Sequence, residues 1–108
     1  GHERVFELEE PAYVSAVNMA ETRSRLTDKG LNTDEIEQTL DVFNKIVVDF
    51  TDLDAVAVAG LRKSTRSAGL SLGDRACLAL AQRLGATALT ADRTWATISL
   101  PMKVEVIR

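Results

Sequence analysis

The feature of the sequence that most restricts its fold is a regular alternation of short strand-like segments with longer helical patterns. Runs rich in β-branched or other apolar residues predict strands at four places, namely residues 12–14, 46–48, 87–90 and 103–107. Strands joined through helices instead of tight turns run parallel, and a parallel sheet needs helices on both faces. The expected architecture is therefore an α/β fold of three layers, α/β/α, with a mostly parallel central sheet.

Helix start and stop signals divide the rest of the sequence. A Ser, Thr or Asn precedes each helical pattern, and Gly30 and Gly85 follow two of them as left-handed stops. The predicted helices cover residues 15–29, 32–44, 51–65 and 71–84, with a turn or short helix at 91–96. The second should bury Ile36, Leu40 and Phe43, which recur at helical spacing. The apolar positions of the third are Leu53, Val56, Ala57, Gly60, Leu61 and Ser64.

Composition limits the possible classes of protein. A chain of 108 residues, 45% of them hydrophobic, fits one domain over residues 1–108 with a modest core. Its net charge of −3 provides no general attraction for nucleic acid, so any polyanion must be held locally by a few arginines or a metal. Cys77 is the only cysteine, which excludes an intrachain disulfide and a cysteine-cluster zinc site and favours a cytoplasmic location. No apolar run approaches the roughly 20 residues of a membrane span, so no membrane partner is expected.

Three acidic residues come close to the expected carboxyl ends of strands, the edge at which ligands bind in such sheets. They are Glu21, Asp74 and Asp92. Each has an ordinary alternative. Glu21 could be a solvated glutamate paired with Arg25, Asp74 could complement the dipole of its helix, and Asp92 could form a turn. Asp74 lies at the border of the apolar stripe of its helix, where its carboxylate can be half covered.

Convergence of these acids would have a chemical consequence. Two ionised carboxylates at about 5 Å repel by roughly 3 kcal/mol at an effective dielectric near 20. Such a cluster needs either a shared proton or a dication. Oxygen ligands without a nearby histidine suit Mg²⁺ or Mn²⁺ better than zinc, and the only histidine, His2, is expected to be solvated.

The ordered motifs resemble the PIN-domain ribonucleases, and most closely the VapC toxins of type II toxin–antitoxin systems. The matching stretches are YVSAVN at residues 13–18 leading to Glu21, SLGDR at 71–75, and LTADR at 89–93 ending in Trp95. The resemblance implies a Mg²⁺- or Mn²⁺-dependent endoribonuclease in which Glu21, Asp74 and Asp92 are catalytic metal ligands. It also implies a homodimer and a cognate VapB-like antitoxin.

The family's fourth acid is an aspartate on a first, central strand, and this chain has no such strand. Residues 1–10 look like the remainder of the helix that follows it. We therefore expect the fold to be N-terminally incomplete, with the missing segment supplied by another polypeptide, as a partner strand, or in a parent protein. The alternative function is a non-catalytic module, derived from a nuclease, that binds RNA or the antitoxin.

Further residues are candidates for supporting roles. Thr90, Ser15 and Asn18 could contact a ligand, a water or a phosphate, with capping or packing as the alternative. The expected RNA-binding residues are Arg62, Lys63, Arg66, Arg75 and Arg93, although a charged run is usually a solvated face. Trp95 is expected in the core or at a subunit contact. A phosphoryl-accepting receiver domain is a remaining alternative, but its paired acids and downstream lysine are not found.

Overall fold

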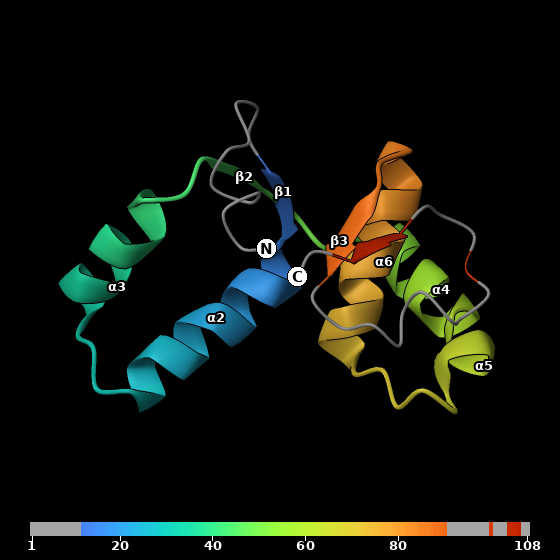
Figure 1. Ribbon diagram of the computed structural model, residues 1–108, viewed down its shortest axis with the longest axis horizontal. Coiled ribbons are helices and arrows are strands. Elements are labelled where there is room, and N and C mark those ends of the chain that lie inside the picture. The colour runs from blue at the N-terminus through green and yellow to red at the C-terminus, as the bar shows by residue number, and fades with distance from the viewer. Residues whose placement is uncertain (1–11, 91–99, 101–103, 107–108) are drawn as a thin grey trace.

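The computed structural model describes residues 12–90, 100 and 104–106. The strands are β1 (Ala12–Ser15), β2 (Lys45–Val48), β3 (Ala88–Thr90) and β4 (Val104–Val106), and they alternate with helices as expected. The helices are α2 (Ala16–Asp28), α3 (Thr33–Asp41), α4 (Asp52–Gly60), α5 (Arg62–Thr65) and α6 (Leu72–Leu84) (Figure 1). Among the described residues, no helix is long and apolar enough to cross a membrane.

Local capping explains where these helices begin. The side chains of Asn32, Thr51 and Ser71 each accept a hydrogen bond from the backbone N–H three residues later. The carboxylate at that later position accepts a hydrogen bond from the backbone N–H of the capping residue. These three capping boxes satisfy N–H groups that a helix start leaves free. Gly85 ends α6 in a left-handed conformation with φ of 62°, which glycine adopts without a steric penalty. The predicted starts of α3, α4 and α6 and the predicted end of α6 are confirmed, whereas α3 ends at Asp41, before the predicted residue 44.

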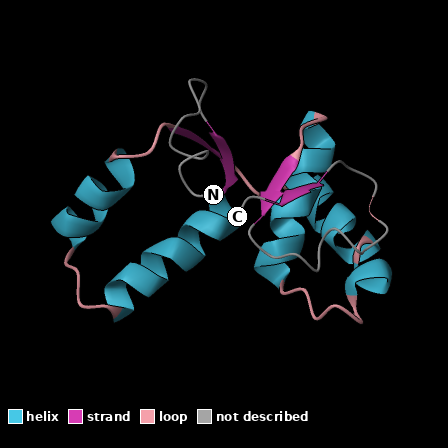
Figure 2. Cartoon of the chain, viewed as in Figure 1, coloured by secondary structure: helices cyan, strands magenta, loops and turns pink. Residues whose placement is uncertain are grey.

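The strands pair in parallel, but in two separate sheets. β1 pairs with β2 from Ala12 opposite Lys45 to Ser15 opposite Val48, and β3 pairs with β4 from Ala88 opposite Val104. Figure 2 shows the two pairs apart. The parallel α/β class is confirmed, whereas the described strands do not form one continuous central sheet, because no strand of one pair hydrogen-bonds to a strand of the other. That a further strand completes the fold stays a prediction.

Helix α6 connects the parts of the structure, since it packs against α4, α2, β1 and β3. Two buried clusters adjoin it, one with Leu61, Leu70, Leu78 and Ala81 and one with Val58, Ala76 and Ala79. A third cluster lies between α2 and α3 and consists of Met19, Ile36 and Leu40. The core is therefore small and divided, with its larger part around α6.

Two predictions about buried faces were wrong. Phe43 is 41% exposed, because α3 already ends at Asp41 and the residue no longer follows the helix period. In α4 the buried residues are Asp54 and Val58, whereas Leu53 and Val56 are 74% and 66% exposed. Helix α4 is apolar on almost every side, so its sequence pattern does not define one buried face.

Candidate functional site between α2 and α6

Glu21 of α2 lies directly against the first turn of α6. A Cβ atom added at Gly73 would overlap the carboxylate of Glu21, its nearest neighbour there. One turn earlier on α2, Nδ2 of Asn18 donates a hydrogen bond of 2.9 Å to the carbonyl oxygen of Gly73. Asn18 and Glu21 thus hold the start of α6 against α2, and the contact depends on residue 73 having no side chain.

Asp74, the residue after Gly73, already has a structural task. Its Oδ2 accepts a hydrogen bond of 3.0 Å from the backbone N–H of Ser71, and its own N–H donates to Ser71 Oγ at 3.1 Å. The side chain is partly exposed, and Oδ1 has no partner among the described residues. The alternative role of Asp74 at the start of its helix is therefore confirmed. Its second carboxylate oxygen remains available to a ligand.

The three-acid cluster is described only in part. Asp92 lies outside the described residues, as do Arg93 and Trp95, and Thr90 belongs to β3 without a described side chain. Within the described part of the chain, no group of three or more His, Cys, Asp or Glu side chains is placed to hold a metal. Glu21 and Asp74 both carry carboxylate oxygens, the donor type that a hard dication takes, and Glu21 contacts the residue before Asp74. Convergence of all three acids stays a prediction.

An open groove of about 540 Å³ runs beside Glu21 between α2 and α6. Its lining from α2 is Val17, Ala20, Glu21, Ser24 and Arg25, and its lining from α6 is Leu72 and Gly73. The sequence pattern did not identify Gly73 or Arg25 as parts of a site. An available signal was a glycine inside the first turn of a strongly patterned helix, where it costs up to about 1 kcal/mol relative to alanine and often marks a close approach.

Ser15 and Asn18 are used by the fold itself. Ser15 is buried, and its Oγ accepts a hydrogen bond of 3.2 Å from the N–H of Val17, so it caps α2. The amide nitrogen of Asn18 is bound to Gly73. Both side chains therefore position α2 and its neighbour α6, and direct ligand contacts from them stay a prediction.

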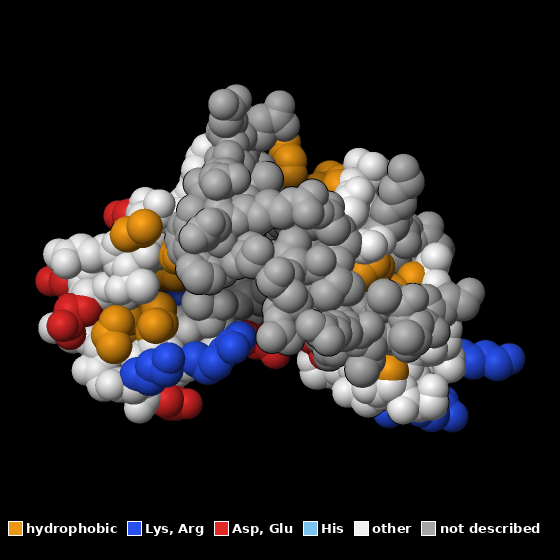
Figure 3. Space-filling model, viewed as in Figure 1, with side chains coloured by type: hydrophobic (Ala, Val, Ile, Leu, Met, Phe, Trp, Pro, Cys, Tyr) orange, Lys and Arg blue, Asp and Glu red, His pale blue; other side chains and the backbone are white. Residues whose placement is uncertain are grey.

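The predicted RNA-binding cations lie in different environments. Arg62 and Lys63 on α5 and Arg66 just after it are exposed. Figure 1 places α5 on the side of α6 that is away from α2. On the face in Figure 3, basic side chains gather over α2 and near α5, with acidic side chains visible between them.

Arg75 does not project into solvent, contrary to the expectation of a rim contact. It is 8% exposed, and its Nη1 donates a hydrogen bond of 3.1 Å to the carbonyl oxygen of Val58 in α4. Its Nε is buried without a hydrogen-bond partner. The turn of α6 directs this side chain onto α4, so a phosphate contact from Arg75 would first require it to leave that packing.

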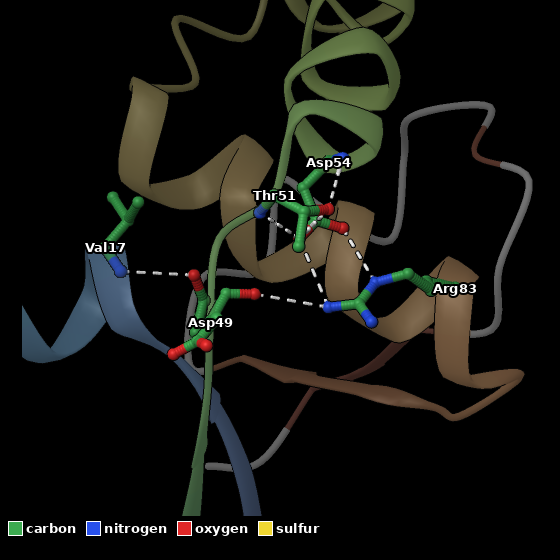
Figure 4. Close-up of polar contacts among 6 residues, drawn as sticks. Val17, Asp49, Thr51, Asp54 and Arg83 are labelled. Carbon is green, nitrogen blue, oxygen red and sulfur yellow. Dashed lines mark hydrogen bonds and ion pairs between the residues drawn. The ribbon is translucent and has the colours of Figure 1, made fainter.

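A second polar cluster was not predicted and joins α4 to α6. Asp54 is 3% exposed, and Arg83 binds it through Nε to Oδ1 at 2.8 Å and Nη2 to Oδ2 at 3.2 Å (Figure 4). The backbone N–H of Thr51 donates to Oδ2 at 2.9 Å, and Arg83 also reaches the carbonyl oxygen of Asp49. The Thr51 N–H, and then Arg83, lower the pKa of Asp54 against the opposing effect of burial.

The Asp54–Arg83 cluster is a structural link, because every oxygen of its carboxylate is satisfied within the fold. The capping pair Thr51 and Asp54 could have been found in the sequence, whereas the pairing with Arg83 could not. Cys77, also on α6, is mostly covered, and burial together with the charge of Asp74 raises the pKa of its thiol. A raised thiol pKa does not favour a reactive cysteine.

Comparison with known proteins decides the family. Residues 1–99 match the PIN domain. The chain belongs to the PIN-domain family. The expected resemblance is confirmed, and PIN domains are in general nucleases. The family assignment also removes the receiver-domain alternative.

A solved structure shares the fold of this PIN domain. The chain is similar to one in the crystal structure of VapBC2 from Rickettsia felis bound to a DNA fragment from their promoter. The TM-score is 0.72 and the identity 18%, and the match covers 98% of this chain and 81% of that one. No curated protein matches the chain. At this identity the likeness concerns the fold alone.

Proposed function

We propose that this PIN domain is the toxin component of a VapC-type toxin–antitoxin pair and hydrolyses RNA phosphodiester bonds with Mg²⁺ or Mn²⁺. The observation that carries the proposal is the contact of Glu21 with Gly73, next to Asp74. It places the Glu21 carboxylate against the turn of α6 that also carries Asp74. Carboxylates gathered in this way are the donor set that a hard dication requires.

In this mechanism, Asp74 and Asp92 bind the metal, and Glu21 either binds it or orients the attacking water. A bound dication would activate that water and offset the negative charge that develops on the phosphate. Gly73 leaves space for the Glu21 carboxylate, and Asn18 keeps α2 in register with α6. The N-terminal N–H groups of α6 favour an anionic phosphate at the same place.

A second candidate is a non-catalytic module that binds RNA or the antitoxin. The observation that favours it is that the described residues hold no group of three or more His, Cys, Asp or Glu side chains placed for a metal. By the resemblance, the family's fourth acid lies on a first strand, which is not among the described residues. We propose that activity requires that strand and its aspartate.

The proposed protein partners are a VapB-like antitoxin and a second copy of the chain. The exposed Leu53 of α4 lines a groove of about 510 Å³ between α4 and α6, together with Ala57 and Gly60, and Val56 of the same helix is exposed as well. Protruding apolar side chains beside a hollow are what a self-complementary interface needs. A monomeric mass in solution by light scattering would refute the dimer, and failure to bind the antitoxin encoded beside it would refute that partner.

RNA cleavage with Mg²⁺, with Mn²⁺ and with EDTA tests the proposed function. We expect metal-dependent cleavage, reduced about 10²-fold or more by Glu21→Gln or Asp74→Asn, the scale of losing one electrostatic contact to transition-state charge. Asparagine at position 74 keeps an acceptor for Ser71, so the helix cap survives. Glu35→Gln is the matched control, because Glu35 has the same capping task in α3, away from α6.

The assay is run on the chain as given and on a longer form that also carries the family's first strand with its aspartate. Cleavage only by the longer form would agree with a requirement for that strand. Absence of metal-dependent cleavage in both forms would end the nuclease proposal and leave the binding module.

A further inference from the structure

Arg25 is the one cation among the described residues that line the groove beside Glu21. It is exposed and forms no ion pair or side-chain hydrogen bond with the described residues. Glu21 precedes it by four positions, the spacing at which such pairs commonly form on a helix. Here the Glu21 carboxylate contacts Gly73 instead, so the guanidinium of Arg25 is left available.

Arg23, two residues earlier on the same helix, shows the contrast. Its guanidinium binds the carboxylate of Glu37 in α3. Positions two apart on a helix point about 200° away from each other, so Arg23 faces α3 while Arg25 faces the groove. One helix thus carries a cation that binds α3 and a cation that has no partner among the described residues.

We propose that a single-stranded RNA lies along this groove and that Arg25 binds a phosphate next to the one positioned at Glu21 and Asp74. The proposal rests on the proposed function, since it takes that pair of acids as the reacting end of the groove. Glu21 and Arg25 are four residues apart on α2, which is about 6 Å along the helix axis at 1.5 Å per residue. A guanidinium can donate hydrogen bonds to two phosphate oxygens at once. It would therefore orient the RNA strand in addition to attracting it.

Other features of the groove suit a nucleic-acid strand. Leu72 is 54% exposed at the opposite wall and offers an apolar surface to a base. Ser24 donates its hydroxyl to the carbonyl oxygen of Ala20, and its oxygen can still accept a hydrogen bond. Helix α5, which carries Arg62 and Lys63, lies by contrast on the side of α6 away from α2 (Figure 1). Arg25 is therefore better placed than they are to contact RNA at the acids.

Binding of a fluorescein-labelled single-stranded oligouridylate, followed by anisotropy in EDTA, tests this inference without cleavage. Arg25→Gln should weaken binding several-fold and make the slope of log K against log salt shallower by about 0.7, the value for one lost phosphate contact on a single strand. Arg25→Lys should keep the slope and lose part of the affinity. Arg23→Gln is the matched control, with the same charge change on the same helix, and should leave the slope unchanged.

Equal losses from Arg23→Gln and Arg25→Gln would overturn the inference, since net charge alone would then explain the binding. So would an unchanged affinity in Arg25→Gln when circular dichroism shows an intact helix content. A labelled acidic peptide that binds more tightly than the RNA, and depends on Arg25, would assign the groove to a protein partner and also overturn it.

The test of RNA binding through Arg25 and the test of RNA cleavage can succeed or fail independently. Wild-type protein that binds RNA through Arg25 but never cleaves it supports the groove and refutes the nuclease. Protein that cleaves RNA equally well with Arg25→Gln, in both KM and kcat, supports the nuclease and refutes the groove. Cleavage with a raised KM and an unchanged kcat in Arg25→Gln supports both.

Discussion

The α4–α6 region and the α2–α3 region are each crossed by one arginine–carboxylate pair, yet the two pairs differ in their surroundings. The Asp54 side chain is 5% exposed in its pair with Arg83, whereas Arg23 and Glu37 are 45% and 49% exposed in theirs. Their hydrogen bond raises the pKa of Arg23 and lowers that of Glu37. An exposed pair of this kind contributes little to stability, while breaking a buried one leaves an uncompensated charge.

The proposed site joins these two unequal regions. Asp74 belongs to α6, which most of the core surrounds, and Glu21 belongs to α2, which packs on α3 through the small cluster of Met19, Ile36 and Leu40. The difference indicates that α6 provides the fixed frame of the site. The position of Glu21 relative to that frame depends on a few contacts, chiefly the Asn18 bond to Gly73.

The largest expected effect comes from breaking the buried pair. Asp54→Ala should lower the free energy of unfolding by about 3 kcal/mol, the lower end for a buried pair that loses one partner. The lower end applies because Arg83 keeps 34% of its side-chain surface exposed. Urea unfolding measures this loss. Glu37→Ala is the control in the exposed pair, and an equal loss there would show that the two regions do not differ as the structure indicates.

An intermediate effect is expected where the two regions meet. Gly73→Ala forces the Glu21 carboxylate aside, and we expect RNA cleavage to fall by about tenfold to 10²-fold, as for a small misplacement of a reacting group. Stability should hardly fall, because alanine favours the helix by up to about 1 kcal/mol. Gly60→Ala is the control, since nothing lies within 4 Å of a Cβ there. Full activity in Gly73→Ala would mean that this contact does not position the site.

The smallest expected effect is a dependence of the free energy of unfolding on pH in the acidic range. The pKa of Asp54 is lowered in the folded protein, so its contribution is complete above the ordinary carboxyl value of about 3.9 and is lost as the pH falls through the folded pKa. The stability difference between wild type and Asp54→Asn should therefore shrink below about pH 4. Urea unfolding from neutral pH to about pH 3 measures it. A constant difference across that range would contradict a lowered pKa.

Several parts of the fold could be predicted from local sequence. The capping pairs at Asn32, Thr51 and Ser71 act within four residues of chain, so their chemistry is visible without tertiary structure. Parallel pairing also followed, because helical crossovers impose it. The buried face of α4 did not, since nearly all its positions are apolar and only packing against α6 selects Val58 over Val56. The burial of Arg75 could not be predicted either, because a charged residue normally indicates an exposed position.

The proposed site was predictable in part for a related reason. Glu21 and Asp74 could be named from their places near predicted strand ends, but the contact of Glu21 with Gly73 and the place of Arg25 at the groove depend on how α2 meets α6. The convergence of Asp92 with them is still a prediction.

The sequence by itself determined where the capped helices begin, where α6 ends, that the strands run parallel, and which family the motifs resemble. These properties depend on short-range hydrogen bonding, steric preference and the period of apolar residues. Only the tertiary structure decided which of the described arginines are buried or paired and that Glu21 adjoins Gly73. Those outcomes depend on the distance and dielectric between groups far apart in the chain, which no local pattern specifies.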